Sequence, residues 1–190
     1  MAVGPQPVGT ESYRTFMSSF PTGVSVVTTV DTDGRPRGMT CSSLSSVSLD
    51  PPVLSVCLSV TSGTLSSLRS HGRFGVNLLG ESASPVARLF ADSAQSHFDR
   101  VPWRPADDSG VPRLGGDTIA FAACRVADTK LVGDHVVIFG EVLAADCGAG
   151  TPLLYGRRQF AGWPGGTQGG PAGPPAGRLD PAVSPLPPTG

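Results

Sequence analysis

The sequence has little charge and almost no lysine. Only 15% of its 190 residues are charged, the formal net charge is -1, and Lys130 is the single lysine. Proteins that bind nucleic acid or an anionic membrane surface carry basic patches that supply much of their affinity. The low charge therefore argues against nucleic acid and against a membrane surface as binding partners.

Long hydrophobic runs are also absent. No apolar stretch approaches the roughly 20 residues that a membrane-spanning helix needs. The N-terminal residues, MAVGPQPVGTESY, have neither the basic region nor the apolar core of a signal peptide. We therefore expect a cytoplasmic protein that makes no membrane contact.

Cysteines are few and widely spaced. The four are Cys41, Cys57, Cys124 and Cys147, with no CxxC pair among them. Three lie in apolar runs typical of strands, where a reduced and buried thiol is the ordinary state. We expect neither disulfides nor a zinc site.

Common catalytic motifs are missing as well. The sequence contains no HExxH, no GxSxG, no paired-carboxylate spacing and no GxGxxG or GxxxxGK[ST], and its three histidines, His71, His97 and His135, are far apart. Catalysis by a metal or by a protein nucleophile therefore has little support. If the chain is an enzyme, an organic cofactor is expected to carry the chemistry.

The composition divides the chain into one domain and two tails. Residues 164–190 contain eight prolines and seven glycines and almost no large apolar residue. Such a segment cannot bury enough surface to offset its ordering entropy, so we predict a disordered tail. Residues 1–12 are predicted to be a flexible N-terminus, which leaves 13–163 as a single domain of ordinary size.

Strand patterns dominate this domain. The apolar and β-branched runs GVSVVTTV, PRGMTCSSL, VLSVCLSV, RFGVNLL, TIAFAACRVAD and HVVIFGEVLAAD predict about six strands, and DTDG predicts a hairpin turn between the first two. Helices are predicted at TLSSLRSHG, at SPVARLFAD and near 13–19. Many short strands with few helices favour a β-barrel or a sandwich.

Between two predicted strands, the segment GMTCSSLSSVSLDPP holds five serines within 42–48. Such a segment is either a solvated loop or a polar cradle, in which hydroxyl and backbone groups bind a ring system or a phosphate. The nearby TSGTL is either a plain capped turn or a helix start whose free N–H groups attract phosphate.

Six segments occur in the order and spacing of a known family. They are FPTGVSVVTT, DGRPRGMTCSSLSSVSLDPPVLSVCLSVTSGT, HGRFGVNLL, HFDRVPWRP, GDHVVIFGEVL and PLLYGRR. Together they closely resemble the short flavin reductases that serve as reductase components of two-component flavin-dependent monooxygenases. The resemblance runs from about Phe16 to Phe160, and GMTxSSxxSVSxDPP and GDHxxxxGEV are its specific patterns.

This resemblance implies a mainly β fold, namely a split β-barrel of the FMN-binding type with a few short flanking helices. It also implies a homodimer that binds FMN or FAD near the subunit interface. The serine-rich segment would line the flavin ring, and the TSGTL elbow would hold its phosphate. The implied flavin residues are Thr40, Ser42, Ser43, Leu44, Ser45, Ser46, Ser48, Leu49, Ser62, Gly63, Thr64, Leu65, Asn77, Gln95 and Ser96.

A second set of residues matches the region that meets the nicotinamide nucleotide, NADH or NADPH. These residues are His135, Tyr155, Gly156, Arg157 and Arg158, of which His135 is the catalytic candidate. Each of these assignments has a simpler alternative. His135 could be a histidine at the start of a strand that hydrogen-bonds to the backbone, and Arg157 and Arg158 could be ordinary surface arginines. The chain departs from its relatives at SVTSG, which lacks the basic residue they often carry before the elbow. Helix N–H groups or Arg69 would then face the phosphate.

The predicted function is that of an NAD(P)H:flavin oxidoreductase. Hydride would pass from NAD(P)H to FMN or FAD at a distance set by positioning, without a protein nucleophile. The reduced flavin would then diffuse to a partner monooxygenase. Two alternatives stay open: a split-barrel flavoprotein that retains FMN and acts directly on a small substrate, and a non-catalytic flavin-binding protein.

Overall fold

The computed structural model describes residues 6–92, 97–107 and 109–164. The predicted C-terminal tail, apart from its first residue, and the predicted flavin residues Gln95 and Ser96 lie outside these ranges. Within them no helix is long and apolar enough to cross a membrane.

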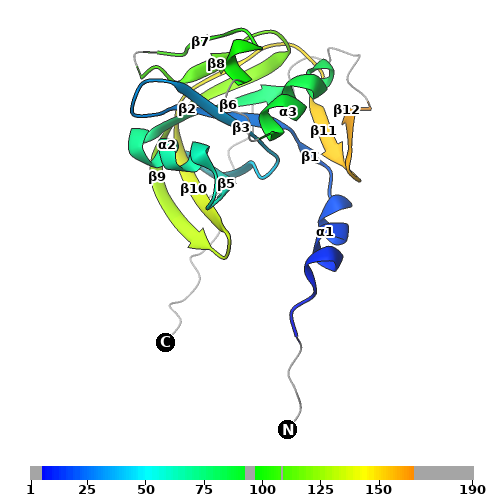
Figure 1. Cartoon of the computed structure of the whole chain (residues 1–190). Coiled ribbons are helices and arrows are strands. Elements are labelled where there is room, and N and C mark those ends of the chain that lie inside the picture. Colours follow the sequence, from blue (N-terminus) through cyan, green and yellow to red (C-terminus); the bar gives the residue numbers. More distant parts are fainter. Residues whose placement is uncertain (1–5, 93–96, 108, 165–190) are drawn as a thin grey trace.

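A seven-stranded antiparallel sheet forms the body of the protein (Figure 1), in the order β3-β2-β6-β9-β10-β5-β4. Its strands are β2 (Ser25–Val30), β3 (Pro36–Cys41), β4 (Ser45–Leu49), β5 (Pro52–Ser59), β6 (Arg73–Leu79), β9 (Thr118–Val132) and β10 (His135–Cys147). Although β3 and β5 are far apart in this order, they contact each other, so the sheet curls back on itself. The result is the mainly β, split-barrel architecture that the sequence predicted.

The described residues also form two smaller sheets and three short α-helices, of which α1 extends away from the large sheet (Figure 1). One sheet has the order β1-β11-β12, and the other pairs β7 with β8. The bounds of these strands are β1 (Thr22–Gly23), β7 (Trp103–Pro105), β8 (Pro112–Leu114), β11 (Leu153–Gly156) and β12 (Gln159–Gly162). The helices are α1 (Thr10–Ser18), α2 (Gly63–His71) and α3 (Ser84–Ala91), with 3-10 turns η1 (Glu81–Ala83) and η2 (His97–Asp99).

Alternation of side chains explains why the large sheet forms a core. In β5, Val56 and Leu58 are fully buried while Cys57 between them is partly exposed, which is the period of a strand with one face inside. These residues pack with Phe74 of β6, Ile138 of β10 and Leu68 of α2 in one apolar cluster. A second cluster lies beneath α3 and includes Leu153 of β11. The two clusters fix α2 and α3 on the sheet.

All six predicted strands are present, with shifts at their ends. The RFGVNLL run is β6, and β9 and β10 extend beyond their predicted ends as one long hairpin. The hairpin at DTDG also forms, because Asp31 Oδ1 accepts hydrogen bonds from the backbone N–H groups of Asp33 and Arg35 at 3.0 and 2.9 Å. The first helix begins at Thr10, three residues earlier than the sequence pattern indicated.

Candidate functional site

A groove of about 1030 Å³ lies over strand β3. Strand β3 contacts α2 and α3, which Figure 1 shows on either side of it. The groove therefore has β3 as its floor, the start of α2 as one wall, and α3 with η2 as the opposite wall. The β11–β12 hairpin adds Tyr155, Arg158 and Phe160 to its lining.

The floor is shaped by Gly38 and Thr40. A Cβ atom on Gly38 would lie 3.1 Å from Phe90 and 3.2 Å from Phe98, so glycine lets these rings close over the strand. Thr40 donates a hydrogen bond from Oγ1 to the carbonyl oxygen of Ala87 at 2.6 Å. This bond ties the middle of α3 to the floor.

The wall at the start of α2 offers unsatisfied backbone donors. Ser62 is the N-cap residue but makes no side-chain capping bond, because its hydroxyl donates instead to Met39 Sδ at 3.1 Å. The first N–H groups of a helix have no intrahelical acceptor, and the positive end of the helix dipole lies beside them. Since Ser62, Gly63 and Thr64 line the groove, this wall suits a phosphate.

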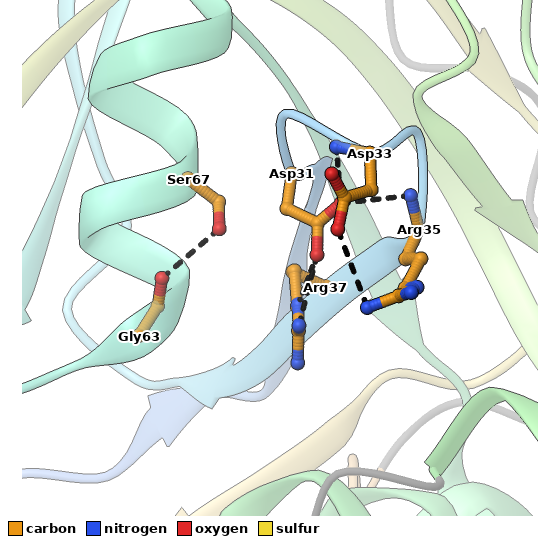
Figure 2. Close-up of polar contacts among 6 residues, drawn as sticks. All are labelled: Asp31, Asp33, Arg35, Arg37, Gly63 and Ser67. Atoms are coloured by element: carbon orange, nitrogen blue, oxygen red, sulfur yellow. Dashed lines mark hydrogen bonds and ion pairs between the residues drawn. The ribbon is translucent and has the colours of Figure 1, made fainter.

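A paired arginine lies in the same part of the groove. Arg37 of β3 lines it and donates two hydrogen bonds to Asp31 Oδ2, at 3.0 Å from Nε and 2.8 Å from Nη2. Figure 2 shows this pair in the β2–β3 hairpin beside α2, with Gly63 at the start of the helix. The backbone N–H of Arg35 and the Arg37 side chain lower the pKa of the Asp31 carboxyl, so this pair stays ionised at neutral pH. Arg37 is thus held rigidly beside the first turn of α2.

The opposite wall contains a buried histidine. His97 is 6% exposed, contacts Phe90 with ring centroids 5.1 Å apart and the rings tilted by 54°, and lines the groove. Its Nε2 atom is buried without a hydrogen-bond partner. Burial lowers the pKa of the imidazole, and Arg100 adds to this effect while Asp92 opposes it. His97 is therefore neutral at physiological pH.

The hairpin wall combines aromatic rings with arginines. Tyr155 and Phe160 are cross-strand partners with ring centroids 5.0 Å apart, and the Arg88 guanidinium lies 5.0 Å from the Phe160 centroid. The turn between the two strands consists of Arg157 and Arg158, both with positive φ, 48° and 62°. Glycine or asparagine is usual at such positions, so arginine here costs backbone energy. Backbone strain of this kind is typical of functional segments.

The groove brings together part of the predicted site. Its lining includes Thr40, Ser42, Ser62, Gly63 and Thr64 from the flavin set, and Tyr155 and Arg158 from the nucleotide set. Among the described residues, the predicted members outside the lining are Ser43, Leu44, Ser45, Ser46, Ser48, Leu49, Leu65, Asn77, His135, Gly156 and Arg157. Arg69, the expected phosphate countercharge, is also outside it, whereas Arg37 lines the groove.

Asn77, a predicted flavin residue, has its side-chain amide hydrogen-bonded within the fold. It is fully buried in β6, where Nδ2 donates to Val26 O and Thr28 Oγ1 at 3.2 Å each, and Oδ1 accepts from Leu114 N at 2.8 Å. Its amide is thus used to join β2, β6 and β8 beneath the site.

His135 lies near the groove without lining it. It begins β10 in register with Ser59, which is a lining residue, and its side chain is 48% exposed. Its Nδ1 lies 2.8 Å from Asp134 Oδ1, and this contact orients the ring. This position leaves His135 at the rim beside the α2 wall.

Sequence reasoning missed most of the lining residues, among them Arg37, Arg88 and His97. Arg37 and Arg88 are single residues in otherwise ordinary strand and helix patterns, so no local signal marked them. His97 is the first residue of HFDRVPWRP, directly after Gln95 and Ser96, and this adjacency was the available signal.

No group of three or more metal-binding side chains occurs in the described parts of the chain.

Comparison with known proteins decides the family. Residues 17–164 match the model of the flavin reductase like domain. The chain belongs to this flavin reductase family. The resemblance inferred from the sequence is therefore confirmed.

Individual flavin reductases align over most of the chain. The flavin reductase (NADPH) of Lentzea aerocolonigenes is 49% identical over 151 residues, which cover 80% of this chain and 88% of the relative. The reductase component of the 4-nitrophenol 4-monooxygenase/4-nitrocatechol 2-monooxygenase of Rhodococcus opacus is 34% identical and covers 82% of each chain. Among solved structures, the NADH:FAD oxidoreductase of Streptomyces globisporus C-1027, in complex with NAD and FAD fragments, matches with a TM-score of 0.78 and 31% identity. That match covers 86% of this chain and all of the solved one.

Proposed function

We propose that this protein is an NAD(P)H-dependent flavin reductase that reduces FMN or FAD and supplies the product to a partner monooxygenase. The observation that carries the proposal is the groove over β3, in a chain of the flavin reductase family. Its floor has no side chain at Gly38, and its α2 wall presents free N–H groups. The groove volume is at the upper end of the range for small-molecule sites, which suits an extended ring system and its phosphate chain.

In this proposal each wall has a separate task. Residues 62–64 bind the flavin phosphate beside the Arg37–Asp31 ion pair, and Thr40 and Ser42 border the ring system beside the floor. His97 and the hairpin residues Tyr155 and Arg158 face them from the other walls, where the nicotinamide nucleotide enters. When bound, flavin supplies the hydride acceptor for NAD(P)H. The protein positions the two ring systems and excludes water, and none of its lining side chains is needed as a nucleophile.

The partner follows from the same reasoning. The Rhodococcus opacus relative is a monooxygenase reductase component, and this chain is similar to it over four fifths of its length. We propose that the flavin is a diffusible substrate and that the partner receives it in the reduced form. Retention of the flavin and direct action on a small substrate is the rival function.

We also propose a homodimer. The support is the unusual exposure of aromatic side chains on and next to α1, with Phe16 72% and Phe20 63% exposed. Sedimentation equilibrium tests this proposal: a single monomeric species at micromolar concentration contradicts it.

The decisive test of the function is NAD(P)H oxidation with and without added FMN, FAD or riboflavin. The proposal expects coenzyme consumption that depends on added flavin and saturates with it. Turnover that needs a third substrate but no added flavin favours the rival enzyme. Bound flavin without any coenzyme consumption favours a non-catalytic binding protein.

Two variants of Gly63 test the phosphate wall. Gly63→Pro removes one N–H at the first helical position, where proline fits, and Ser62 already has the extended backbone that proline requires of the residue before it. Gly63→Ala keeps the N–H and adds a Cβ with nothing within 4 Å. We expect the proline variant to bind FMN roughly tenfold more weakly than the alanine variant, with no such difference for riboflavin, which lacks the phosphate. Equal FMN affinities would remove this wall from the site.

A further inference from the structure

The arginines of the groove are not equivalent. Arg37, Arg88 and Arg158 line it together with one carboxylate, Asp92. Arg37 is neutralised by its ion pair with Asp31. Within the described ranges, neither Arg88 nor Arg158 forms an ion pair. The hairpin side of the groove is therefore the side with unneutralised positive charge, in a chain whose net charge is -1.

Both of these arginines keep donors available for a ligand. Arg88 makes a cation–π contact with the Phe160 ring, with Cζ 5.0 Å from the ring centroid, and its guanidinium is in none of the ion pairs of the described residues. Arg158 lies two residues before Phe160 and lines the same groove. Its positive φ shows that the turn holds this arginine against ordinary backbone preference.

This arrangement has the chemistry of a site for an aromatic base that carries a phosphate group. The Tyr155–Phe160 pair offers ring surface to a base, and two guanidiniums match the oxygens of a phosphate monoester. NAD and NADP differ only in the phosphate on the adenosine 2′-hydroxyl. Proteins select NAD by a carboxylate that accepts from this hydroxyl and accommodate NADP by arginine. The hairpin segment LLYGRRQFAG contains two arginines and no carboxylate.

We propose that Arg88 and Arg158 bind the 2′-phosphate of NADPH and make this protein select NADPH over NADH. The inference rests on the proposed function and adds a coenzyme preference to it. The α2 wall, which lies across β3 from α3, binds the flavin phosphate. Flavin and NADPH therefore enter the groove from opposite sides and meet over β3.

The test begins with binding of two fragments to the full-length protein, measured by calorimetry. 2′,5′-ADP carries the 2′-phosphate and 5′-AMP lacks it. We expect 2′,5′-ADP to bind at least about tenfold more tightly, and Arg88→Gln and Arg158→Gln each to remove most of that difference. Arg104→Gln is the control, because Arg104 is an exposed arginine of β7 outside the groove.

Steady-state kinetics at saturating flavin gives the second readout. The ratio of kcat/KM for NADPH to that for NADH should exceed about ten in the native protein and fall about tenfold in each glutamine variant. Arg158→Glu should lower NADPH use further while sparing NADH. Circular dichroism establishes that each variant is folded.

The outcomes separate this inference from the function on which it rests. Equal binding of the two fragments, or an equal loss of both coenzymes in the variants, overturns the 2′-phosphate site while flavin-dependent turnover still supports the reductase. If neither coenzyme is oxidised, the proposed function fails, and the fragment affinities still decide whether the phosphate site exists.

Discussion

The hydroxyl of Ser43 lies 2.8 Å from the backbone nitrogen of Cys57 and 3.2 Å from the carbonyl oxygen of the same residue. Ser43 follows the end of β3, whereas Cys57 is in β5, beyond the last β4–β5 pair, Ser45 with Ser55. One side chain therefore accepts from the N–H and donates to the C=O at the place where the two ends of the curled sheet meet. The Ser43 side chain thus takes the place of a backbone partner for Cys57 on the side of β5 where the pairing with β4 has ended.

Ser43→Ala is expected to lower the stability of the protein. The variant loses both hydrogen bonds to Cys57 and the 3.1 Å contact of the hydroxyl with Cys41 Sγ. The free energy of unfolding should fall by about 1 kcal/mol, because water reaches this exposed position and replaces part of the loss. Urea denaturation measures the change. Ser45→Ala is the control, since the Ser45 hydroxyl makes only a 3.4 Å contact with Ser46 O. A Ser43→Ala variant as stable as the control would show that the junction does not depend on this hydroxyl.

Asn77→Ala should affect the fold more than the groove. The variant leaves the buried Leu114 N–H and two acceptors without the Asn77 partner, so we expect a loss of about 3 kcal/mol in the free energy of unfolding. Flavin affinity of the folded protein, measured at low temperature by fluorescence quenching, should change less than about threefold. If Asn77→Ala were as stable as the native protein but bound flavin weakly, Asn77 would belong to the flavin site and this prediction would be wrong.

His97 should make stability depend on pH. Its pKa is lowered in the folded protein by burial, whereas the unfolded imidazole has its ordinary pKa of 6.5. The unfolded state therefore binds the proton first, so stability present above pH 6.5 is lost as the pH falls toward the folded pKa. Asp92 raises the pKa of His97 and so limits the size of this effect, whereas Arg100 lowers the pKa and adds to it.

The variant His97→Phe keeps the aromatic contact with Phe90 and removes the titrating group. Its free energy of unfolding should fall less than that of the native protein between about pH 7 and about pH 5. The other two histidines are common to both proteins and cancel in the comparison. Parallel pH profiles would show that His97 does not contribute.

His135→Ala tests a role at the rim of the groove. We expect kcat/KM for the nicotinamide coenzyme to fall roughly tenfold, the worth of one charge-assisted hydrogen bond, with flavin affinity unchanged. His71→Ala is the control, because His71 is in the last turn of α2 and its Nδ1 contacts Arg73 O at 3.2 Å, away from the groove. If His135→Ala had the same kinetics as the native protein, His135 would have no role in coenzyme binding and would be only the first residue of β10.

The sequence predicted the large sheet well because local patterns determine it. The alternation in VLSVCLSV and the Asp-Gly turn at DTDG are properties of a few neighbouring residues, and they appear as β5 and the β2–β3 hairpin. The same holds for the helix start at TSGTL. Six shorter strands were missed, namely β4 at the edge of the large sheet and β1, β7, β8, β11 and β12 in the two small sheets.

The groove was predicted less completely, because its lining comes from segments that only the fold brings together. Arg37 and Arg88 are 51 positions apart and enter the lining through the contact between β3 and α3. Ser43 and Asn77 stand in motifs typical of flavin sites. In this chain, backbone groups of β5 and β8 compete for their polar atoms, and a sequence pattern does not reveal such competition.

The three-stranded sheet has a consequence for biosynthesis. Thr22 of β1 pairs with Tyr155 of β11, whereas every strand of the seven-stranded sheet ends by Cys147. A chain emerging from the ribosome can therefore complete its barrel while the hairpin that carries Tyr155 and Arg158 is still inside the exit tunnel. The last part of the domain to be synthesised is the wall that we assign to the coenzyme. The seven-stranded sheet can therefore form before this wall is in place, whereas the cluster beneath α3 is completed only when Leu153 of β11 joins it.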